Sequence, residues 1–293
     1  MTRLLRANFA RLWKSKPFWI CAVLAFAFNI LSNIDATDSW TYQTGQTVLS
    51  SGSKIMLFSS VFAALYLGTE YACGTIRNKL AVGHSRAKVY FSSLVTVITG
   101  SLLMLALCSV PSIFKSVVWG KELGMETGEF LLRLAILICA VISASAIFTL
   151  LGMSITSKSL TTTFTLVLTF VLLLGSMSLL QFLSQPEYIP ENQITARDDL
   201  EADGMPPFVA AYVTETETKE DGAAYNLVPN PMYITGMRRD IMNTVIDVLP
   251  GGQMLTLQSS YTHNEKLYPL YSLGVIAVTT AAGMLVFRRK DLK

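Results

Sequence analysis

Six long stretches of the chain are almost free of Asp, Glu, Lys and Arg. A helix needs roughly 20 apolar residues to cross the hydrocarbon core of a membrane, and each stretch comes close to or exceeds that length. Lipid offers no partner to free backbone groups, and the stretches lack the alternation of a barrel strand, so we expect helices. The sequence therefore predicts an all-α integral membrane protein with six transmembrane helices. They cover residues 17–34, 55–74, 89–114, 134–157, 159–185 and 267–287, with Glu70 inside the second.

Composition supports this class, because a chain that is 52% hydrophobic and 15% charged is too apolar for a soluble domain. The first stretch follows five basic residues, as the core of a cleaved signal peptide would. It is longer than a usual signal core, however, and no small-x-small cleavage site follows, so we expect it to be retained. Pro111 lies near the end of the third stretch and is expected to kink or end that helix.

Basic residues are distributed unevenly between the connecting segments. Fourteen of the 23 Lys and Arg fall in residues 1–16, the 74–88 connection, Lys158 and the tail from Arg288, whereas the short connections on the other side hold four. Basic connections are retained on the cytoplasmic side, so this distribution predicts that both termini face the cytoplasm. We expect a basic cytoplasmic tail after the last span, within residues 267–293.

The long connection at residues 186–266 is acidic, with 13 acidic and five basic residues, and is assigned to the outside as a partly structured subdomain. Within it, residues 237–248 carry apolar side chains at helical spacing. Leu249-Pro250-Gly251-Gly252 ends that pattern before a second apolar run at 254–257, which predicts a short helical hairpin.

All four cysteines lie in or at the ends of spans, so no disulfide framework is expected.

The connection between the second and third spans carries the most information. Residues 68–88 read GTEYACGTIRNKLAVGHSRAK. Gly74 can end one helix, and Thr75 can cap the start of another. A short basic helix lying across the cytoplasmic end of the spans is therefore predicted.

The apolar spacing of this short helix indicates which face is buried. Ile76 and Leu80 are four residues apart and can share one face. Arg77 and Lys79 are then expected to point elsewhere.

This connection resembles the signature of permease subunits of ABC transporters of the ABC-2 class, approximately E-x-x-x-G-T-x-[RK]-x-x-L-x-x-G-x-[ST]-R. Leu249-Pro250-Gly251-Gly252-Gln253 and the ending at 287–292 also look like segments of that family. The resemblance covers almost the whole chain apart from the 186–266 connection. The residues that match the signature are Glu70, Gly74, Thr75, Arg77, Leu80, Gly83, Ser85 and Arg86.

The resemblance implies that residues 75–85 form a coupling helix seated in a groove of a separate ATPase subunit. It further implies that a second permease chain, identical or related, completes the transporter and that the complex lies in the cell membrane of a bacterium. The exported compound would be an amphipathic peptide, a bacteriocin-like compound or a hydrophobic drug. The chain has no phosphate loop, so ATP and Mg²⁺ are expected to bind to the ATPase. This chain itself is not expected to be an enzyme or to bind a cofactor, a metal or nucleic acid. The implied coupling residues are Glu70, Gly74, Thr75, Arg77, Asn78, Lys79, Leu80, Gly83, Ser85 and Arg86.

Two alternatives stay open at this connection. Its basic residues could merely satisfy the positive-inside distribution. Glu70 is expected near the interface, paired with Arg77 or Arg86, because a carboxylate at the membrane centre is costly. Glu70 then either connects the second span to the coupling helix or is a simple interfacial carboxylate.

Residues 1–16 are interpreted as an amphipathic helix in the inner headgroup layer. Its apolar face holds Leu5, Phe9, Leu12 and Trp13, and its basic residues, Arg6 among them, lie largely off that face. In the resembling family such a helix also supports the ATPase; membrane anchoring alone is the alternative.

Other function classes find less support in the sequence. An intramembrane enzyme needs polar groups at membrane depth, and no span interior contains His, Asp or Lys. Ser259, His263 and Asp247 can be written as a triad, but no nucleophile-elbow sequence surrounds the serine. An immunity or sensor protein that binds an extracellular ligand through residues 186–266 is the main alternative.

Small residues recur in two spans and permit close helix packing. They favour either a dimer seam or ordinary packing within one subunit. The fourth span holds Ala140, Ser143, Ala144, Ser145 and Gly152, and the sixth holds Gly274, Ala277, Ala281 and Gly283.

Overall fold

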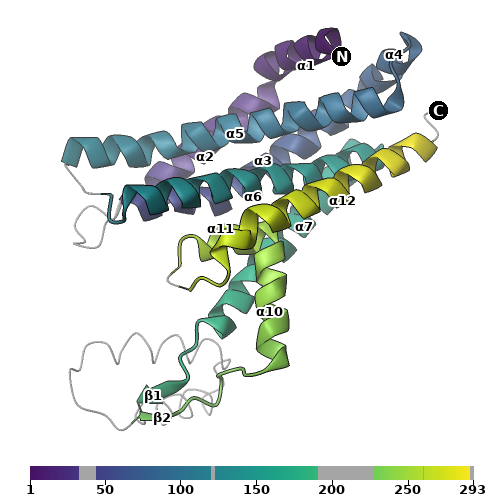
Figure 1. Ribbon diagram of the computed structural model, residues 1–293. Coiled ribbons are helices and arrows are strands. Elements are labelled where there is room, and N and C mark those ends of the chain that lie inside the picture. The colour runs from purple at the N-terminus through teal and green to yellow at the C-terminus, as the bar shows by residue number, and fades with distance from the viewer. Residues whose placement is uncertain (33–43, 120–122, 191–226, 260, 291–293) are drawn as a thin grey trace. The chain divides into compact units, whose positions relative to one another are not determined.

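The computed structural model describes residues 1–32, 44–119, 123–190, 227–259 and 261–290, and these are mostly helical (Figure 1). The elements are α1 (Thr2–Lys14), α2 (Lys16–Ser32), α3 (Thr44–Ala72), α4 (Thr75–Ala81), α5 (Arg86–Trp119), α6 (Thr127–Ser154), α7 (Lys158–Leu183), β1 (Tyr188–Pro190), β2 (Leu227–Pro229), α10 (Met237–Val248), α11 (Pro250–Thr256), the 3₁₀ turn Glu265–Leu267 and α12 (Tyr268–Arg289).

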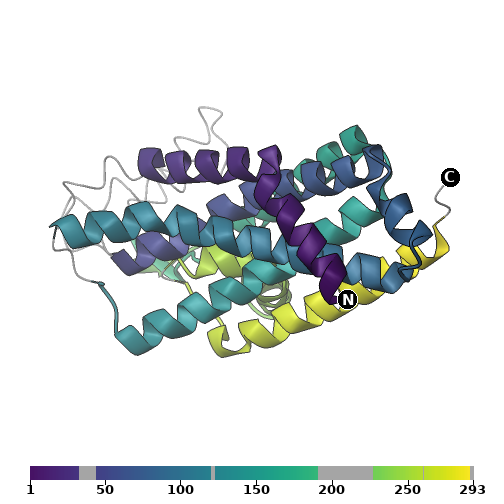
Figure 2. The ribbon, with the colours of Figure 1, turned by 90° about the horizontal axis from the view of Figure 1, so that it is seen from above.

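The chain forms two compact units. The larger one, residues 1–180 and 243–293, is a helix bundle in which α2, α3, α5, α6 and α12 pack along one another. Helix α1 lies across α5 (Figure 2), and α11 packs against α3 and α6. The N-terminus, α4 and the C-terminal end of α12 lie at one end of this bundle, which we call the α4 end.

Among the residues that the structure describes, five helices are long and apolar enough to cross a membrane: α3, α5, α6, α7 and α12, the last together with the preceding 3₁₀ turn. This agrees with the expected multi-pass membrane protein. Helix α2 has 17 residues and reaches spanning length only together with α1, from which it is bent by 56°.

Several spans begin earlier or end later than the sequence indicated. Helix α3 begins at Thr44 instead of Ile55, and α6 begins at Thr127 instead of Leu134. The polar first turns of α3 are stabilised by contacts with neighbouring helices: Asn29 of α2 donates to the Ser51 hydroxyl at 3.0 Å, and the Thr44 hydroxyl donates to Ser116 of α5 at 2.8 Å.

Pro111 does not end its helix, because α5 continues to Trp119. Beyond the proline, Ser112 donates to Asn29 of α2, and the Thr44 hydroxyl of α3 donates to Ser116. These contacts with neighbouring helices hold the last turns of α5 in place.

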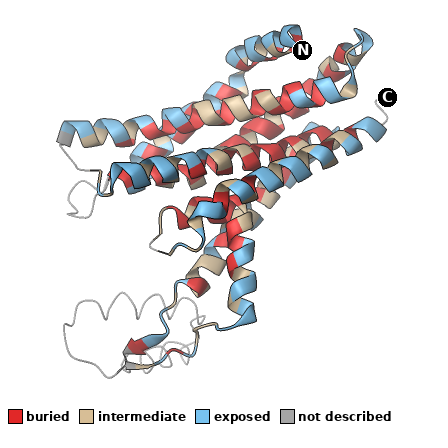
Figure 3. Ribbon diagram, viewed as in Figure 1, coloured by how far each residue is buried: buried red, intermediate tan, exposed pale blue. Residues whose placement is uncertain are grey.

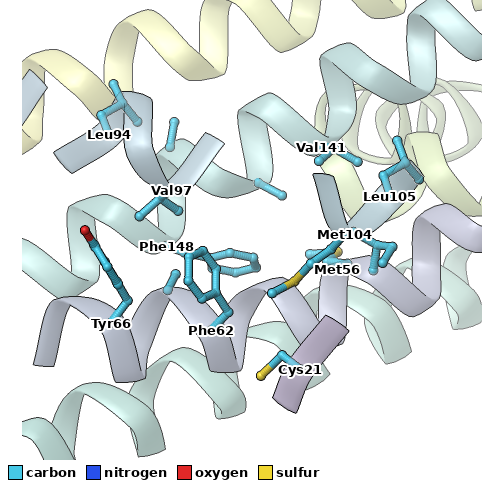
Figure 4. Packing of buried hydrophobic residues seen from close by; sticks show 14 of the residues in the cluster. Cys21, Met56, Phe62, Tyr66, Leu94, Val97, Met104, Leu105, Val141 and Phe148 are labelled. Carbon is cyan, nitrogen blue, oxygen red and sulfur yellow. The ribbon is translucent and has the colours of Figure 1, made fainter. Parts of the chain in front are cut away.

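The inward faces of α3, α5 and α6 form a continuous apolar core (Figure 3). Phe62 of α3, Val97 of α5 and Phe148 of α6 are fully buried and meet near its centre (Figure 4). Helices α7 and α12 bury far less of their apolar surface, with 17% of the spanning window buried in each. They therefore present their apolar sides to whatever surrounds this chain.

The small residues are used largely for packing within the chain. A side chain added at Gly152 would collide with Leu67 of α3, and one added at Gly283 would collide with the Tyr90 ring of α5. In α6, Ala140 and Ser143 to Ser145 are buried in the bundle. In contrast, a Cβ added at Gly274 of α12 would meet no other side chain or helix of the described residues within 4 Å.

The expected outer subdomain, residues 186–266, is divided between the two units. The smaller unit covers Gln181–Met242, and its described part includes the antiparallel pairing of β1 with β2. The predicted break at Leu249 is present, with α10 before it and α11 after it. Asn243 onward belongs to the bundle unit. Residues 191–226 of this connection lie outside the described part of the chain.

Candidate functional site

The candidate site is built around α4, the short helix between α3 and α5. Gly74 precedes it with φ of 66° and Gly83 follows it with φ of 93°, a left-handed conformation that residues with a side chain rarely adopt. The helix covers Thr75–Ala81, so it is shorter than the predicted 75–85 because Gly83 turns the chain. Gly74 is the N-terminal capping residue, whereas the Thr75 hydroxyl accepts a hydrogen bond from Arg11 Nη2 at 3.4 Å instead of capping the helix.

One face of α4 packs on the bundle and the other is exposed. Ile76 is buried and Leu80 packs against the apolar core, as predicted. Lys79 is also buried, so the expectation that it points away is wrong. It lies three residues from Ile76, and residues at that spacing share a helix face. Arg77 and Asn78 are exposed.

Glu70, near the end of α3, is fully buried and is paired with two cations. Its Oε1 accepts hydrogen bonds from Arg11 Nη1 of α1 and from Lys79 Nζ of α4, both at 2.8 Å. The predicted pairing with Arg77 or Arg86 is therefore wrong. Arg77 is on the exposed side of α4, and Arg86 bonds elsewhere.

The charges in this cluster do not cancel. One carboxylate faces two cations, and Glu70 Oε2 has no hydrogen-bond partner among the described residues. Burial lowers the pKa of the Lys79 amine, and the adjacent Glu70 carboxylate opposes that shift. Both interactions connect α3 to a different element, so the cluster joins α1, α3 and α4.

Arg86 and Lys290 form a second polar cluster at the α4 end. Arg86 Nη1 donates to the carbonyl oxygens of Phe287, at 3.0 Å, and Lys290, which satisfies the C-terminal end of α12. Lys290 Nζ donates to the Tyr71 hydroxyl at 3.2 Å and to the Met153 carbonyl at 3.0 Å, and lies 4.3 Å from the Tyr71 ring centre. The ends of α3, α6 and α12 and the start of α5 are thereby joined.

Most residues of the sequence signature thus have a structural role. Ser85 accepts a hydrogen bond from the Lys88 backbone N–H at 3.4 Å, at the start of α5, and Arg86 binds the end of α12. Within the described part of the chain, Arg77 makes no ion pair. Arg77 is therefore the signature residue that α4 exposes to its surroundings, together with Asn78, which is one of the implied coupling residues.

Helix α1 has three faces instead of the predicted two. Leu4, Asn8 and Leu12 are buried against the bundle, where Asn8 Nδ2 donates to Ser92 Oγ of α5 at 3.2 Å. Of the predicted apolar face, Leu12 belongs to this buried side, whereas Phe9 and Trp13 are exposed.

The remaining face of α1 carries exposed basic residues, including Arg6. A helix with a protein-facing, an apolar and a basic side suits the boundary between membrane and water.

The bend between α1 and α2 is held by two tryptophans. Trp19 Nε1 donates to the Trp13 carbonyl at 2.9 Å, and the two rings meet edge to face at 5.5 Å. Both rings are exposed, as is common for tryptophan at a membrane surface.

At the opposite end of the bundle, α11 is held by a buried glutamine. Gln253 Nε2 donates to the carbonyls of Asp247, at 2.7 Å, and Tyr268, at 3.2 Å, and Gln253 Oε1 accepts from Ser272 at 2.7 Å. The Pro-Gly-Gly-Gln segment therefore fixes the start of α12. The sequence located this segment but gave no signal for the role of Gln253.

Asp247 and His263 do come together, with 2.9 Å between Oδ2 and Nδ1. Burial raises the pKa of the Asp247 carboxyl, and the hydrogen bond with His263 opposes that shift. Ser259 instead donates to the carbonyls of Thr256 and Tyr261. These contacts assign the serine to a turn. Within the described ranges, no group of three His, Cys, Asp or Glu side chains could hold a metal ion.

No protein-family model matches this chain, and no curated protein matches it significantly.

The Glu70 cluster gives a stability prediction. Glu70→Gln leaves Arg11 and Lys79 without a carboxylate, and removing one partner from a buried charge cluster costs about 3 kcal/mol. We expect a clear drop in the melting temperature of the detergent-solubilised protein. Glu129→Gln is the matched control, because Glu129 is 46% exposed in its pair with Arg133 and such pairs contribute about 0–1 kcal/mol. Equal melting temperatures for the two variants would contradict the assigned role of Glu70.

The Lys290 cluster gives a pH prediction. Burial lowers the pKa of the Lys290 amine to about 8. Only the neutral amine is acylated, so the labelling rate of Lys290 should rise about twofold between about pH 8 and pH 9.5. An ordinary lysine, with a pKa of about 10.4, should rise roughly 30-fold. Peptide mass spectrometry measures both ratios, and the comparison is independent of accessibility. A roughly 30-fold rise at Lys290 would show that its pKa is ordinary.

Proposed function

We propose that the chain is the membrane-spanning permease subunit of an ATP-driven exporter of the ABC-2 class, with six spans and both termini in the cytoplasm. The observation that carries the proposal is the construction of α4. Its inner face is held by Ile76 and Lys79, and its outer face presents Arg77 and Asn78. A short helix of this kind can contact a partner on one side and move the spans on the other.

Three contacts supply the route by which movement of α4 would reach the membrane. Lys79 connects α4 to Glu70 in α3, and Arg11 connects the same carboxylate to α1. Ile76 belongs to the apolar core that the spans share. Displacing α4 without displacing α3 would separate a buried ion pair, which is unfavourable. The two helices therefore move together.

In this proposal the energy comes from a separate ATPase subunit that holds ATP and Mg²⁺. ATP can shift the conformational equilibrium only through its different affinities for the two states of the complex. The basic face of α1 would lie beside the ATPase. A second permease chain would complete the path, and the exposed apolar sides of α7 and α12 provide surface for that chain or for lipid.

The exported compound is proposed to be an amphipathic peptide, a bacteriocin-like compound or a hydrophobic drug. The acidic 186–266 connection favours a cationic peptide, because opposite charge raises the local concentration of a ligand.

The orientation can be tested at Cys73, which is exposed beside α4, whereas Cys21 and Cys108 are buried. We expect a membrane-impermeant maleimide to label Cys73 in inverted vesicles but not in intact cells, with Cys73→Ser as the background. Lys266→Cys, in the Cys73→Ser chain, places a thiol at the opposite end and should label from outside. Labelling of Cys73 in intact cells would refute the proposed orientation.

The coupling role can be tested at Arg77. Tagged full-length chain purified from native membranes should enrich an ATPase with a phosphate loop, identified by mass spectrometry. Arg77→Glu should reduce this enrichment and substrate-stimulated hydrolysis at least tenfold, because it reverses a charge on the exposed face of α4. Lys266→Glu makes the same charge change at the opposite end and should have no effect.

Two results would argue against this proposal. Equal enrichment with Arg77→Glu would exclude α4 as the contact. Failure of the unmodified chain to enrich any such ATPase would favour an immunity or sensor protein instead.

A further inference from the structure

A cavity of about 460 Å³ lies at the α4 end, beside the bend between α1 and α2. Its lining comes from that bend, from α3 and from the first residue of α7. Four cationic side chains and no described carboxylate line it. The residues that matter for its chemistry are Arg11, Lys14, Lys16, Lys158, Tyr66 and Thr69.

Three of these cations lack a counter-charge among the residues that the structure describes. Arg11 is paired with Glu70, but in the described ranges Lys14, Lys16 and Lys158 make no ion pair. Like charges held around one cavity repel one another, and an anion bound between them removes that repulsion. The cavity is therefore suited to a negatively charged ligand.

The backbone holds these lysines in place from two sides. Lys14 ends α1, Lys16 begins α2, and the 56° bend between the helices turns both side chains toward the cavity. On the other side, Gly68 allows α7 to approach α3 closely: a Cβ there would lie 3.1 Å from Lys158 Cα and 2.9 Å from its Cγ. The three lysines thus all lie at helix ends.

The surroundings of the cavity are those of a membrane surface. Trp13 and Trp19, at the bend, are exposed, and tryptophan gathers where headgroups meet hydrocarbon. Beyond Lys16, Ile20 and Val23 of α2 are exposed, and beyond Lys158, Leu160 and Phe164 of α7 are exposed. A ligand with an anionic end and apolar chains would contact the basic lining with its anionic end and the exposed apolar side chains of α2 and α7 with its chains.

We propose that this cavity binds the phosphate-bearing head group of an anionic phospholipid, with its acyl chains along the exposed apolar faces of α2 and α7. Basic pockets between membrane helices are suited to such head groups. The site needs only that the bundle is embedded in a membrane, so it is independent of the ATPase.

The test uses the full chain, purified in detergent and stripped of lipid. Native mass spectrometry would follow the binding of dioleoyl phosphatidylglycerol, which is anionic, and dioleoyl phosphatidylcholine, which is not. We expect the anionic lipid to bind more tightly. Lys14→Gln, Lys16→Gln and Lys158→Gln should each weaken it about fivefold and the triple variant at least tenfold, in line with the attraction expected per cation. All three side chains are exposed, so the variants should fold.

A charge-matched triple variant, Arg3→Gln with Lys88→Gln and Arg289→Gln, removes three exposed cations that do not line the cavity, and should bind within twofold of the original chain. Equal binding of the two lipids, or equal weakening by the two triple variants, would overturn the proposal. Inorganic phosphate is the third probe. Displacement of the anionic lipid by an equal concentration of phosphate would identify free phosphate as the ligand and overturn the lipid assignment.

Discussion

The arrangement at the α4 end depends on one carboxylate that is removed from water. A buried charge is costly unless partners compensate it, and Glu70 obtains both of its partners from other helices, Arg11 of α1 and Lys79 of α4. These two ion pairs act together with the apolar contacts of Leu12 in α1 and Ile76 in α4, which also bury these helices against the bundle. The exposed face of α4, on which the proposed coupling rests, is the side opposite Ile76, Lys79 and Leu80.

The two ends of the bundle are stabilised by different means. At the α4 end, charged side chains bind carboxylate or carbonyl oxygens of neighbouring helices, as Arg86 does with Phe287. At the opposite end, Gln253 satisfies two backbone carbonyls and a serine hydroxyl without any net charge. Hydrogen bonds between neutral groups do not change with the protonation of a side chain, so the contacts of Gln253 should be insensitive to pH. Ionisable contacts are nevertheless present at this end too, between Asp247 and His263 and between Arg133 and Glu265, so sensitivity to pH and salt is expected at both ends.

The apolar stretches, the break at Leu249 and the turn at Gly74 could be predicted, because each depends on residues close in sequence, whereas the turn at Gly83 lay inside the predicted helix 75–85. The pairing of Glu70 could not, since Arg11 is 59 residues away and local spacing offered Arg77 and Arg86 instead. Lys79 was misplaced because the sequence pattern assigns a lysine to the surface unless a buried partner is known. The start of α3 at Thr44 was missed because its polar turns are stabilised by contacts with other helices, such as that between Asn29 and Ser51.

The position of Glu70 along the chain also bears on how the protein is made. Arg11 is synthesised well before Glu70, and Lys79 follows only nine residues after it. Chains are built from the N-terminus, so Arg11 has already been synthesised when Glu70 leaves the ribosome, and Lys79 follows soon afterwards. Both cations that compensate Glu70 are therefore present in the growing chain as soon as α4 has been synthesised.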